Sequence, residues 1–269
     1  MTSNLRAIFV CFLAYTCFDV MGVHVRILSE TYSPQELSVY RNILGVLPSL
    51  LLLAYSGELT LKLNKYKIKR WKLALGRGLF VAVAQLLLYS ALARLELATV
   101  SALGQTNAIF VVLLAILFYG ETVGIWRWMA VIFGFSGALL IMQPGTDFFV
   151  WSSLLPIGAA FCYAASIVSL RSFDKEVSNS ILYLYSASAA AAGAIVMALG
   201  TTEFSPIAST SDALLILSLS ICGGLGVAFL MYAFRNAAAS VPLTVKISNL
   251  SFNMILFLMI NLFFFKDYF

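Results

Sequence analysis

Four ionisable side chains lie inside long apolar stretches of the sequence, namely Asp19, Arg41, Arg77 and Lys246. A charged group is costly in the hydrocarbon of a bilayer, so such residues usually face a cavity, a substrate or an ion. Asp19 is the only acidic residue well inside one of these stretches. We interpret it either as a proton-coupling or cation-contacting group, or as a structural hydrogen-bonding partner of a neighbouring helix.

The three cationic side chains each lie near an end of their apolar stretch. Lys246 lies about one helical turn inside its stretch. It is the strongest candidate to bind an anionic group of a substrate. Long cationic side chains near a helix end also extend to the membrane surface and bury only their aliphatic stem. Both interpretations stay open for Arg41, whereas Arg77 follows a basic loop and is expected to reach the surface.

Uncharged polar residues form a second group of candidates. Gln85, Gln105 and Asn107 lie in the third and fourth apolar stretches. Such residues either line a cavity or join helices through hydrogen bonds, which contribute about 0.6 kcal/mol on average. Tyr163 and Tyr232 could stack against a flat substrate, although aromatic side chains more often pack between helices.

The sequence carries no recognisable catalytic, metal or nucleotide-binding motif. A P-loop, an HExxH pair, a dinucleotide fingerprint and a nucleophile elbow are all missing. The cysteines lie in apolar stretches without CxxC or Cys/His spacing, so neither a disulfide nor a metal site is predicted. We therefore expect no enzyme activity and no cofactor, and an ATP-driven pump is disfavoured. The cysteines are Cys11, Cys17, Cys162 and Cys222.

Membrane-spanning helices must position these candidates. Hydrophobic residues make up 61% of the chain and charged residues 11%, and the mean hydropathy is +0.95. A helix that crosses the hydrocarbon needs about 20 mostly apolar residues. The prediction is an all-α integral membrane protein with nine spans and no soluble domain. The predicted spans are 5–27, 36–55, 72–93, 98–119, 125–143, 150–171, 179–199, 213–234 and 242–265.

The net charge of +5 is concentrated in short loops. The connection between the second and third spans holds Lys62, Lys65, Lys67, Lys69, Arg70 and Lys72. Cytoplasmic loops carry an excess of lysine and arginine, so this loop and the N-terminus are predicted to be cytoplasmic in a bacterial inner (plasma) membrane. We interpret the basic run as a topology signal and expect no nucleic-acid partner.

The second half of the sequence repeats the first. Five spans per copy would make the second copy enter the membrane from the opposite side, which is the usual construction of a secondary transporter. We predict a first repeat over residues 1–145 and an inverted second repeat over 146–269 that lacks the tenth span. Matching residues are Cys17, Phe18 and Arg26 with Cys162, Tyr163 and Arg171, Arg94 with Arg235, and Gln105 with Lys246.

Glycines and prolines in the spans predict close packing and bends. Gly223, Gly224 and Gly226 either let neighbouring backbones approach or mark a flexible point in a moving helix. Pro48 and Pro156 are expected to kink the second and sixth spans, because proline removes a backbone hydrogen bond.

Three segments together resemble the EamA-like ten-helix proteins of the drug/metabolite transporter superfamily. They are Tyr40-Arg41-Asn42, the segment Tyr89–Leu92 with Ala98-Thr99-Val100, and Gly120-Glu121 with Arg127-Trp128 and residues 134–137. The resemblance runs to about Lys246. It implies a basket of helices around a cavity lined by spans 1, 3, 4, 6, 8 and 9, alternating access, and commonly export of amino acids or other small metabolites.

Two functions from different classes follow from these observations. The leading hypothesis is a secondary active transporter that exports small metabolites, such as amino acids or related compounds, across a lipid bilayer. The alternative is a non-transporting or truncated membrane subunit or paralogue that pairs with another chain, since a tenth span is not seen. A homodimer is compatible with either.

Overall fold

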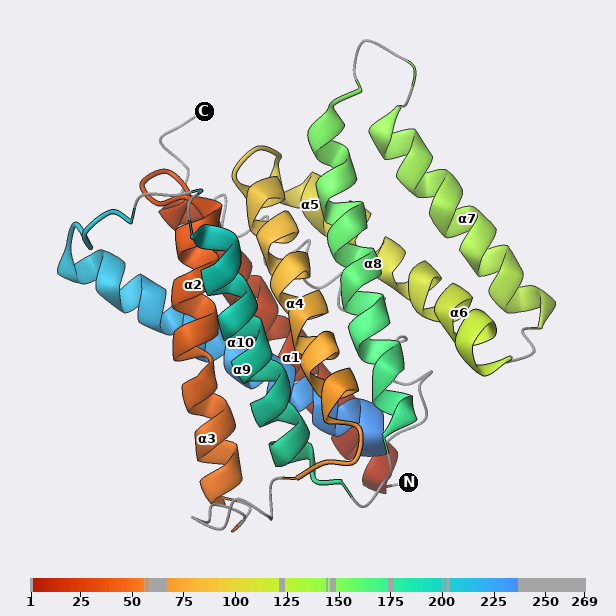
Figure 1. Cartoon of the computed structure of the whole chain (residues 1–269). Helices are drawn as coiled ribbons and strands as arrows, with labels where there is room; N and C mark the ends of the chain where they lie inside the picture. The colour runs from red at the N-terminus through yellow and green to blue at the C-terminus, as the bar shows by residue number, and fades with distance from the viewer. Residues whose placement is uncertain are drawn as a thin grey trace.

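The computed structural model describes residues 2–55, 57, 67–120, 124–143, 145, 149–173, 177–199, 201 and 204–236. These residues form α-helices and short 3-10 helices, with no strand in the ranges just given. Most helices lie side by side and alternate in direction (Figure 1). The α-helices are α1 (Thr2–Leu28), α2 (Pro34–Leu44), α3 (Val46–Tyr55), α4 (Trp71–Leu92), α5 (Leu97–Gly104), α6 (Thr106–Tyr119), α7 (Ile125–Met142), α8 (Leu154–Ser169), α9 (Asn179–Ala198) and α10 (Thr210–Asn236).

The all-α membrane architecture predicted from the sequence is confirmed. Among the described residues, 7 helical segments are long and apolar enough to cross a membrane, and they match predicted spans 1 to 4 and 6 to 8. Predicted span 5 corresponds to α7, whose apolar segment Val131–Met142 is shorter. Predicted span 9, residues 242–265, lies outside the described residues.

Predicted span 2 is divided into α2 and α3. It starts with a capping box in which the Ser33 hydroxyl accepts from Glu36 N at 3.2 Å and the Glu36 carboxylate accepts from Ser33 N at 2.7 Å. The break falls at Gly45, just before Pro48. Proline has no N–H to bond to the carbonyl four residues back, so the interruption expected here is confirmed.

Two other spans differ from expectation. Pro156 lies in the first turn of α8, where a missing N–H does not break the helix, so the kink expected there does not form. Span 4 is instead divided at Gln105 into α5 and α6. There the Thr106 hydroxyl donates to Leu103 O at 2.7 Å, a local bond that competes with regular helical pairing.

Helices from the first half of the chain pack mainly on helices from the second half. α1 runs along α10, α4 lies against both α8 and α9, and α2 and α3 contact α9 and α10. In Figure 1, α4, α9 and α10 therefore meet near the centre, whereas α7 lies at the edge. In the predicted repeat, α1 corresponds to α8 and α4 corresponds to α10. The contact of α1 with α10 therefore has its counterpart in the contact of α8 with α4.

The glycines of α10 let it approach α1, α2 and α3 closely. A Cβ at Gly223 would lie 2.7 Å from Arg41 Nε, one at Gly224 would lie 2.6 Å from Pro48 Cγ, and one at Gly226 would lie 2.8 Å from Phe18 Cε1. Since α10 also runs unbroken through these positions, the packing interpretation of the glycines is confirmed.

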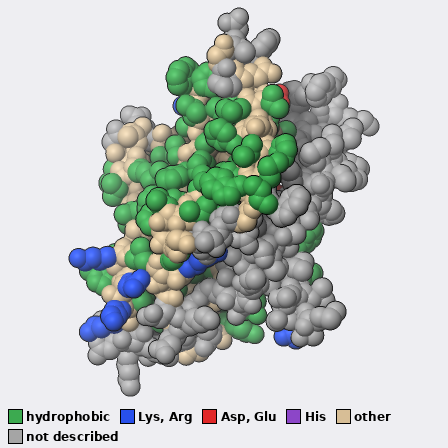
Figure 2. Space-filling model, turned by 90° about the vertical axis from the view of Figure 1, so that its right-hand side faces the viewer, with side chains coloured by type: hydrophobic (Ala, Val, Ile, Leu, Met, Phe, Trp, Pro, Cys, Tyr) green, Lys and Arg blue, Asp and Glu red, His purple; other side chains and the backbone are tan. Residues whose placement is uncertain are grey.

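Exposed lysine and arginine side chains are concentrated at one end of the helix bundle. Figure 2 shows Lys and Arg side chains gathered at one end of the visible face. Exposed cations at that end include Lys67, Lys69, Arg70, Lys72 and Arg171. The connections at the opposite end, among the described residues, carry Glu30 and Glu96 together with one exposed cation, Arg94, and the nearby helix starts carry Glu36 and Asp212.

Candidate substrate pocket

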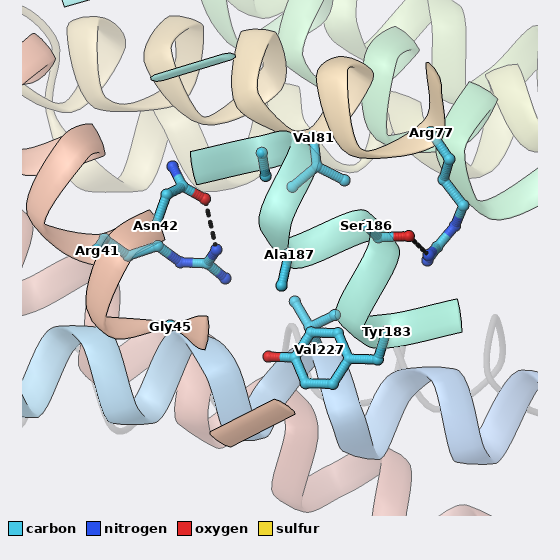
Figure 3. Close-up of a pocket in the computed structure, with 10 residues that line it drawn as sticks. Arg41, Asn42, Gly45, Arg77, Val81, Tyr183, Ser186, Ala187 and Val227 are labelled. Carbon is cyan, nitrogen blue, oxygen red and sulfur yellow. Dashed lines mark hydrogen bonds between the residues drawn. The ribbon is translucent and has the colours of Figure 1, made fainter. Parts of the chain in front are cut away.

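A small cavity of about 20 Å³ lies where α2, α4, α9 and α10 meet (Figure 3). Both halves of the chain contribute to its wall. It is lined by Arg41, Asn42 and Gly45 from α2, Arg77 and Val81 from α4, Tyr183, Ser186, Ala187 and Ala190 from α9, and Val227 from α10. Such a volume holds about one water molecule, so the pocket is nearly closed in this conformation.

Arg41 occupies one side of the pocket and points inward. Its side chain is only 5% exposed. Nη1 donates to Asn42 Oδ1 at 3.0 Å and Nη2 donates to the Gly223 carbonyl at 3.0 Å. Of the two interpretations left open by the sequence, the structure therefore supports an interior role over extension to the membrane surface.

Gln85 completes the environment of Arg41. In the amide orientation that satisfies both neighbours, Gln85 Oε1 accepts from Arg41 Nη1 at 2.7 Å and its nitrogen donates to Asn42 Oδ1 at 2.9 Å. Asn42 Nδ2 in turn donates to Ser38 O at 2.7 Å. The guanidinium of Arg41 is thus held by neutral dipoles from α2, α4 and α10.

Arg77 occupies the other side of the pocket, and the expectation that it reaches the membrane surface is wrong. Its side chain is also 5% exposed. Nε donates to Ser166 O on α8 at 3.0 Å, and Nη1 donates to the Ser186 hydroxyl on α9 at 2.7 Å (Figure 3). These acceptors lie between the helices and draw the guanidinium inward, and Met231 Sδ on α10 lies 3.9 Å from Nη1.

The two arginines make the pocket electropositive. Their hydrogen-bond acceptors are carbonyls, amides, a hydroxyl and a thioether, and no carboxylate within the described ranges forms an ion pair with either guanidinium. Burying a charge without a counter-charge is costly unless dipoles or a bound ion compensate. The arrangement can therefore bind an anion or an electron-rich polar group.

Tyrosines surround the same region. Tyr183 donates from its hydroxyl to the Gly224 carbonyl at 2.7 Å and so ties α9 to α10. Tyr163, a predicted candidate, is partly buried on α8, and Tyr89 on α4 is fully buried. Tyr163 does not line the pocket.

The remaining predicted candidates that the structure describes are not brought into this pocket. Asn107 donates to Ala160 O at 2.8 Å and joins α6 to α8, and Gln105 lies at the junction of α5 and α6. Tyr232 is 46% exposed. Asp19 lies half-buried on α1, which packs on α10, and Lys246 lies outside the described residues.

The sequence reading did not select Asn42, Tyr183 or Ser186. One signal could have found Ser186, because the spacing that relates Cys17 to Cys162 also relates Arg41 to Ser186. Asn42 was noted only as part of the Tyr40-Arg41-Asn42 segment. Tyr183 carried no signal of its own, since its role depends on the approach of α10 at Gly224.

A family model matches about half of this chain, and a solved structure matches most of it. The model of the EamA-like transporter family matches residues 5–143. A crystal structure 18% identical in sequence superimposes with a TM-score of 0.67 and covers 95% of this chain and 89% of its own. At that identity the structural match shows a shared fold.

Curated relatives of the chain are transporters. A riboflavin transporter of Rhizobium johnstonii is 44% identical over 71 residues, which is 26% of this chain and only 24% of that protein. An uncharacterized transporter of Helicobacter pylori J99 is 29% identical and covers 85% of this chain and 78% of its own. The pseudopaline exporter CntI of Pseudomonas aeruginosa UCBPP-PA14 is 25% identical and covers 90% of this chain and 82% of its own.

Proposed function

The chain belongs to the EamA-like family of membrane transporters, and on that premise we propose that it is a secondary active exporter of small metabolites such as amino acids or related compounds. Alternating access is the proposed mechanism. A transporter of this kind acts as a carrier and needs no catalytic step, which agrees with relatives whose names are transporter and exporter.

One observation carries the proposal. The pocket bounded by Arg41 and Arg77 lies between helices of the two halves, so any movement of one half against the other changes its shape. Substrate sites of secondary carriers lie at the interface of their repeats. The near-closed volume of the pocket is what an occluded conformation of such a carrier requires.

The proposed repeats are residues 1–145 and 146–269. The reciprocal contacts of α1 with α10 and of α4 with α8 support this division. Lys246, the counterpart of Gln105 in the second repeat, is a further proposed substrate-contacting residue, together with Gln85 and Tyr163. The assignment predicts that replacing Gln105 with an apolar residue changes the transport rate, whereas replacing the exposed Tyr232 changes the rate less.

Asp19 is the proposed coupling group. It lies on α1, whose neighbouring residues Phe18 and Met21 approach the glycines of α10 beside Arg41. A carboxylate at that depth can exchange a proton as the two halves move. In this scheme outward flux of substrate is driven by inward movement of protons.

The proposed location is a bacterial inner membrane with the N-terminus in the cytoplasm. The end of the bundle with Lys67, Lys69, Arg70, Lys72 and Arg171 would face the cytoplasm, and the end with Glu30 and Glu96 would face outward. The separation of exposed cations from acidic residues supports this orientation through the excess of cations in cytoplasmic loops.

Counterflow in proteoliposomes tests the function. Purified protein is reconstituted with a panel of unlabelled amino acids and related metabolites inside, and uptake of the matching radiolabelled compound is measured. We expect at least one compound to be exchanged well above protein-free liposomes. Absence of exchange for the whole panel, with folded protein and no partner chain, would contradict the proposal and favour a non-transporting subunit. Cross-linking in the same vesicles tests the predicted homodimer.

A further inference from the structure

Arg77 differs from Arg41 in how its donors are used. A guanidinium offers five N–H donors in a rigid planar fork. Arg41 engages Nη1 with Asn42 and Gln85 and Nη2 with Gly223. Arg77 engages Nε with Ser166 and Nη1 with Ser186 and Met231, and within the described ranges no acceptor bonds to its Nη2.

The partners of Nη1 in Arg77 are both neutral, namely the Ser186 hydroxyl at 2.7 Å and the Met231 thioether. The thioether of Met231 lies 3.9 Å away, and thioether sulfur accepts poorly. The Ser186 hydroxyl meanwhile donates to Leu182 O at 2.9 Å, so its contact with Arg77 uses only an oxygen lone pair. A carboxylate would be a better partner for this face of the guanidinium, because charge-assisted bidentate pairs are shorter and stronger than neutral ones.

The surroundings of Arg77 fit the end of an organic acid. Arg41 lies on the opposite side of the pocket and adds positive potential, and Val81, Ala187 and Val227 between them offer a narrow apolar wall (Figure 3). No described side chain on the pocket wall is acidic. The positive wall favours an anionic group over its neutral isostere, and the nearly closed cavity has to widen to admit one.

We propose that Arg77 is the residue that binds a carboxylate of the transported compound, through Nη1 and Nη2, so that the substrate class is organic acids. This inference rests on the proposed transport function. Binding replaces the contacts of Nη1 with Ser186 and Met231, which join α4 of the first half to α9 and α10 of the second. Substrate thereby loosens a link between the halves while its own charge is neutralised.

Formate and formamide provide the probe for this site. They have the same three heavy atoms, and formate is a carboxylate with nothing attached that the pocket must accommodate. Binding of ¹³C-labelled formate to the full detergent-solubilised chain is measured from protein-dependent broadening of its NMR line, at constant ionic strength set with sodium chloride. We expect saturable broadening of formate and none of formamide.

Variants locate the binding and separate it from folding. Arg77→Lys keeps the charge but loses the planar fork, so formate affinity should fall about tenfold. Ser186→Ala removes the competing acceptor and should raise formate affinity several-fold above that of the wild type, which a purely structural role of Arg77 does not predict. The result with Arg77→Lys counts only if this variant is folded, which cooperative thermal unfolding shows. If Arg77→Lys is not folded, the result with Ser186→Ala decides the question.

Several results would overturn the assignment. They are absence of formate broadening, equal broadening by formamide, unchanged affinity in a folded Arg77→Lys variant, or an affinity in Ser186→Ala that does not rise. The proposed transport function fails separately. If formate binds at Arg77 but no compound is exchanged in proteoliposomes, the site stands and the transport proposal does not. If a neutral compound is exchanged and formate does not bind, the reverse holds.

Discussion

Arg41 donates from Nη2 to the backbone carbonyl of Gly223 at 3.0 Å, and it can do so only because residue 223 has no side chain. A Cβ at that position would lie 2.7 Å from Arg41 Nε and 2.8 Å from Met21 Sδ. A buried cation on α2 is therefore placed by the absence of a methyl group on α10. The same contact brings the first half of the chain against the second beside the pocket.

Gly223→Ala should displace Arg41 and lower the thermal stability of the protein. Overpacking of this kind costs about 1–3 kcal/mol, and we expect a lower unfolding temperature together with reduced exchange in proteoliposomes. Gly76→Ala on α4 is the matched control, because nothing lies within 4 Å of the added methyl group. Alanine favours a helix over glycine, so the control should equal or exceed wild-type stability. Equal effects of the two substitutions would contradict the placement of Arg41.

Tyr32→Phe should weaken a contact between the two halves at the end of the bundle away from the exposed cations. The Tyr32 hydroxyl donates to Asp212 Oδ2 at 2.9 Å and accepts from Ala208 N at 2.9 Å. Loss of a net hydrogen bond costs about 1 kcal/mol, so thermal unfolding should begin at a lower temperature. Hydrogen exchange at residues 204–209 should increase most, and unchanged protection there would contradict the prediction.

Arg26→Ala should separate the end of α1 from the end of α4. Arg26 Nη1 donates to Leu92 O at 2.6 Å, where the carbonyls at the C-terminus of α4 carry partial negative charge. Bonds to a charged group contribute about 1.5–3 kcal/mol, so we expect a clear fall in unfolding temperature. Arg6→Ala, at the exposed other end of α1, should have little effect. A comparable loss of stability in both variants would argue against this contact.

The proposed orientation predicts which loops a membrane-impermeant maleimide can label on intact bacteria. In a chain whose four cysteines are replaced by alanine, Ser209→Cys should be labelled and Lys69→Cys should be labelled only after the membrane is opened. Both positions are exposed in the structure and lie at opposite ends of the bundle. The reverse labelling pattern would show that the N-terminus faces outward.

Asp19→Asn should separate exchange from net transport. An amide keeps the size of the carboxyl group but cannot carry a proton across, so proton-driven flux should fall by about tenfold or more. Counterflow of substrate against substrate should persist, since it needs no net proton movement. Both rates are measured in the same proteoliposomes over a range of pH. Proton-driven flux that is unchanged in the variant, with the same pH dependence, would remove Asp19 from the coupling role.

The fold followed largely from local features of the sequence. Apolar length identified the spans that the structure describes, and Pro48 marked the division of span 2, because missing backbone donors act locally. The break at Gln105 is not predicted, because span 4 is assigned by apolar length alone, although Gly104, Thr106 and Asn107 are weak helix formers. The glycines of α10 were read correctly as packing positions, although their partners were unknown.

The sequence by itself determined that this chain is a bundle of membrane helices that resembles a known transporter family, with Arg41 and Gln85 among the candidates for its polar site. Only the tertiary structure decided which cations face the pocket. The sequence predicts that Arg77 reaches the membrane surface, because the sequence gives only the distance of this residue from the end of its helix and not the direction of its side chain. Its actual direction depends on acceptors contributed by Ser166 and Ser186, which lie on other helices and are distant in the chain.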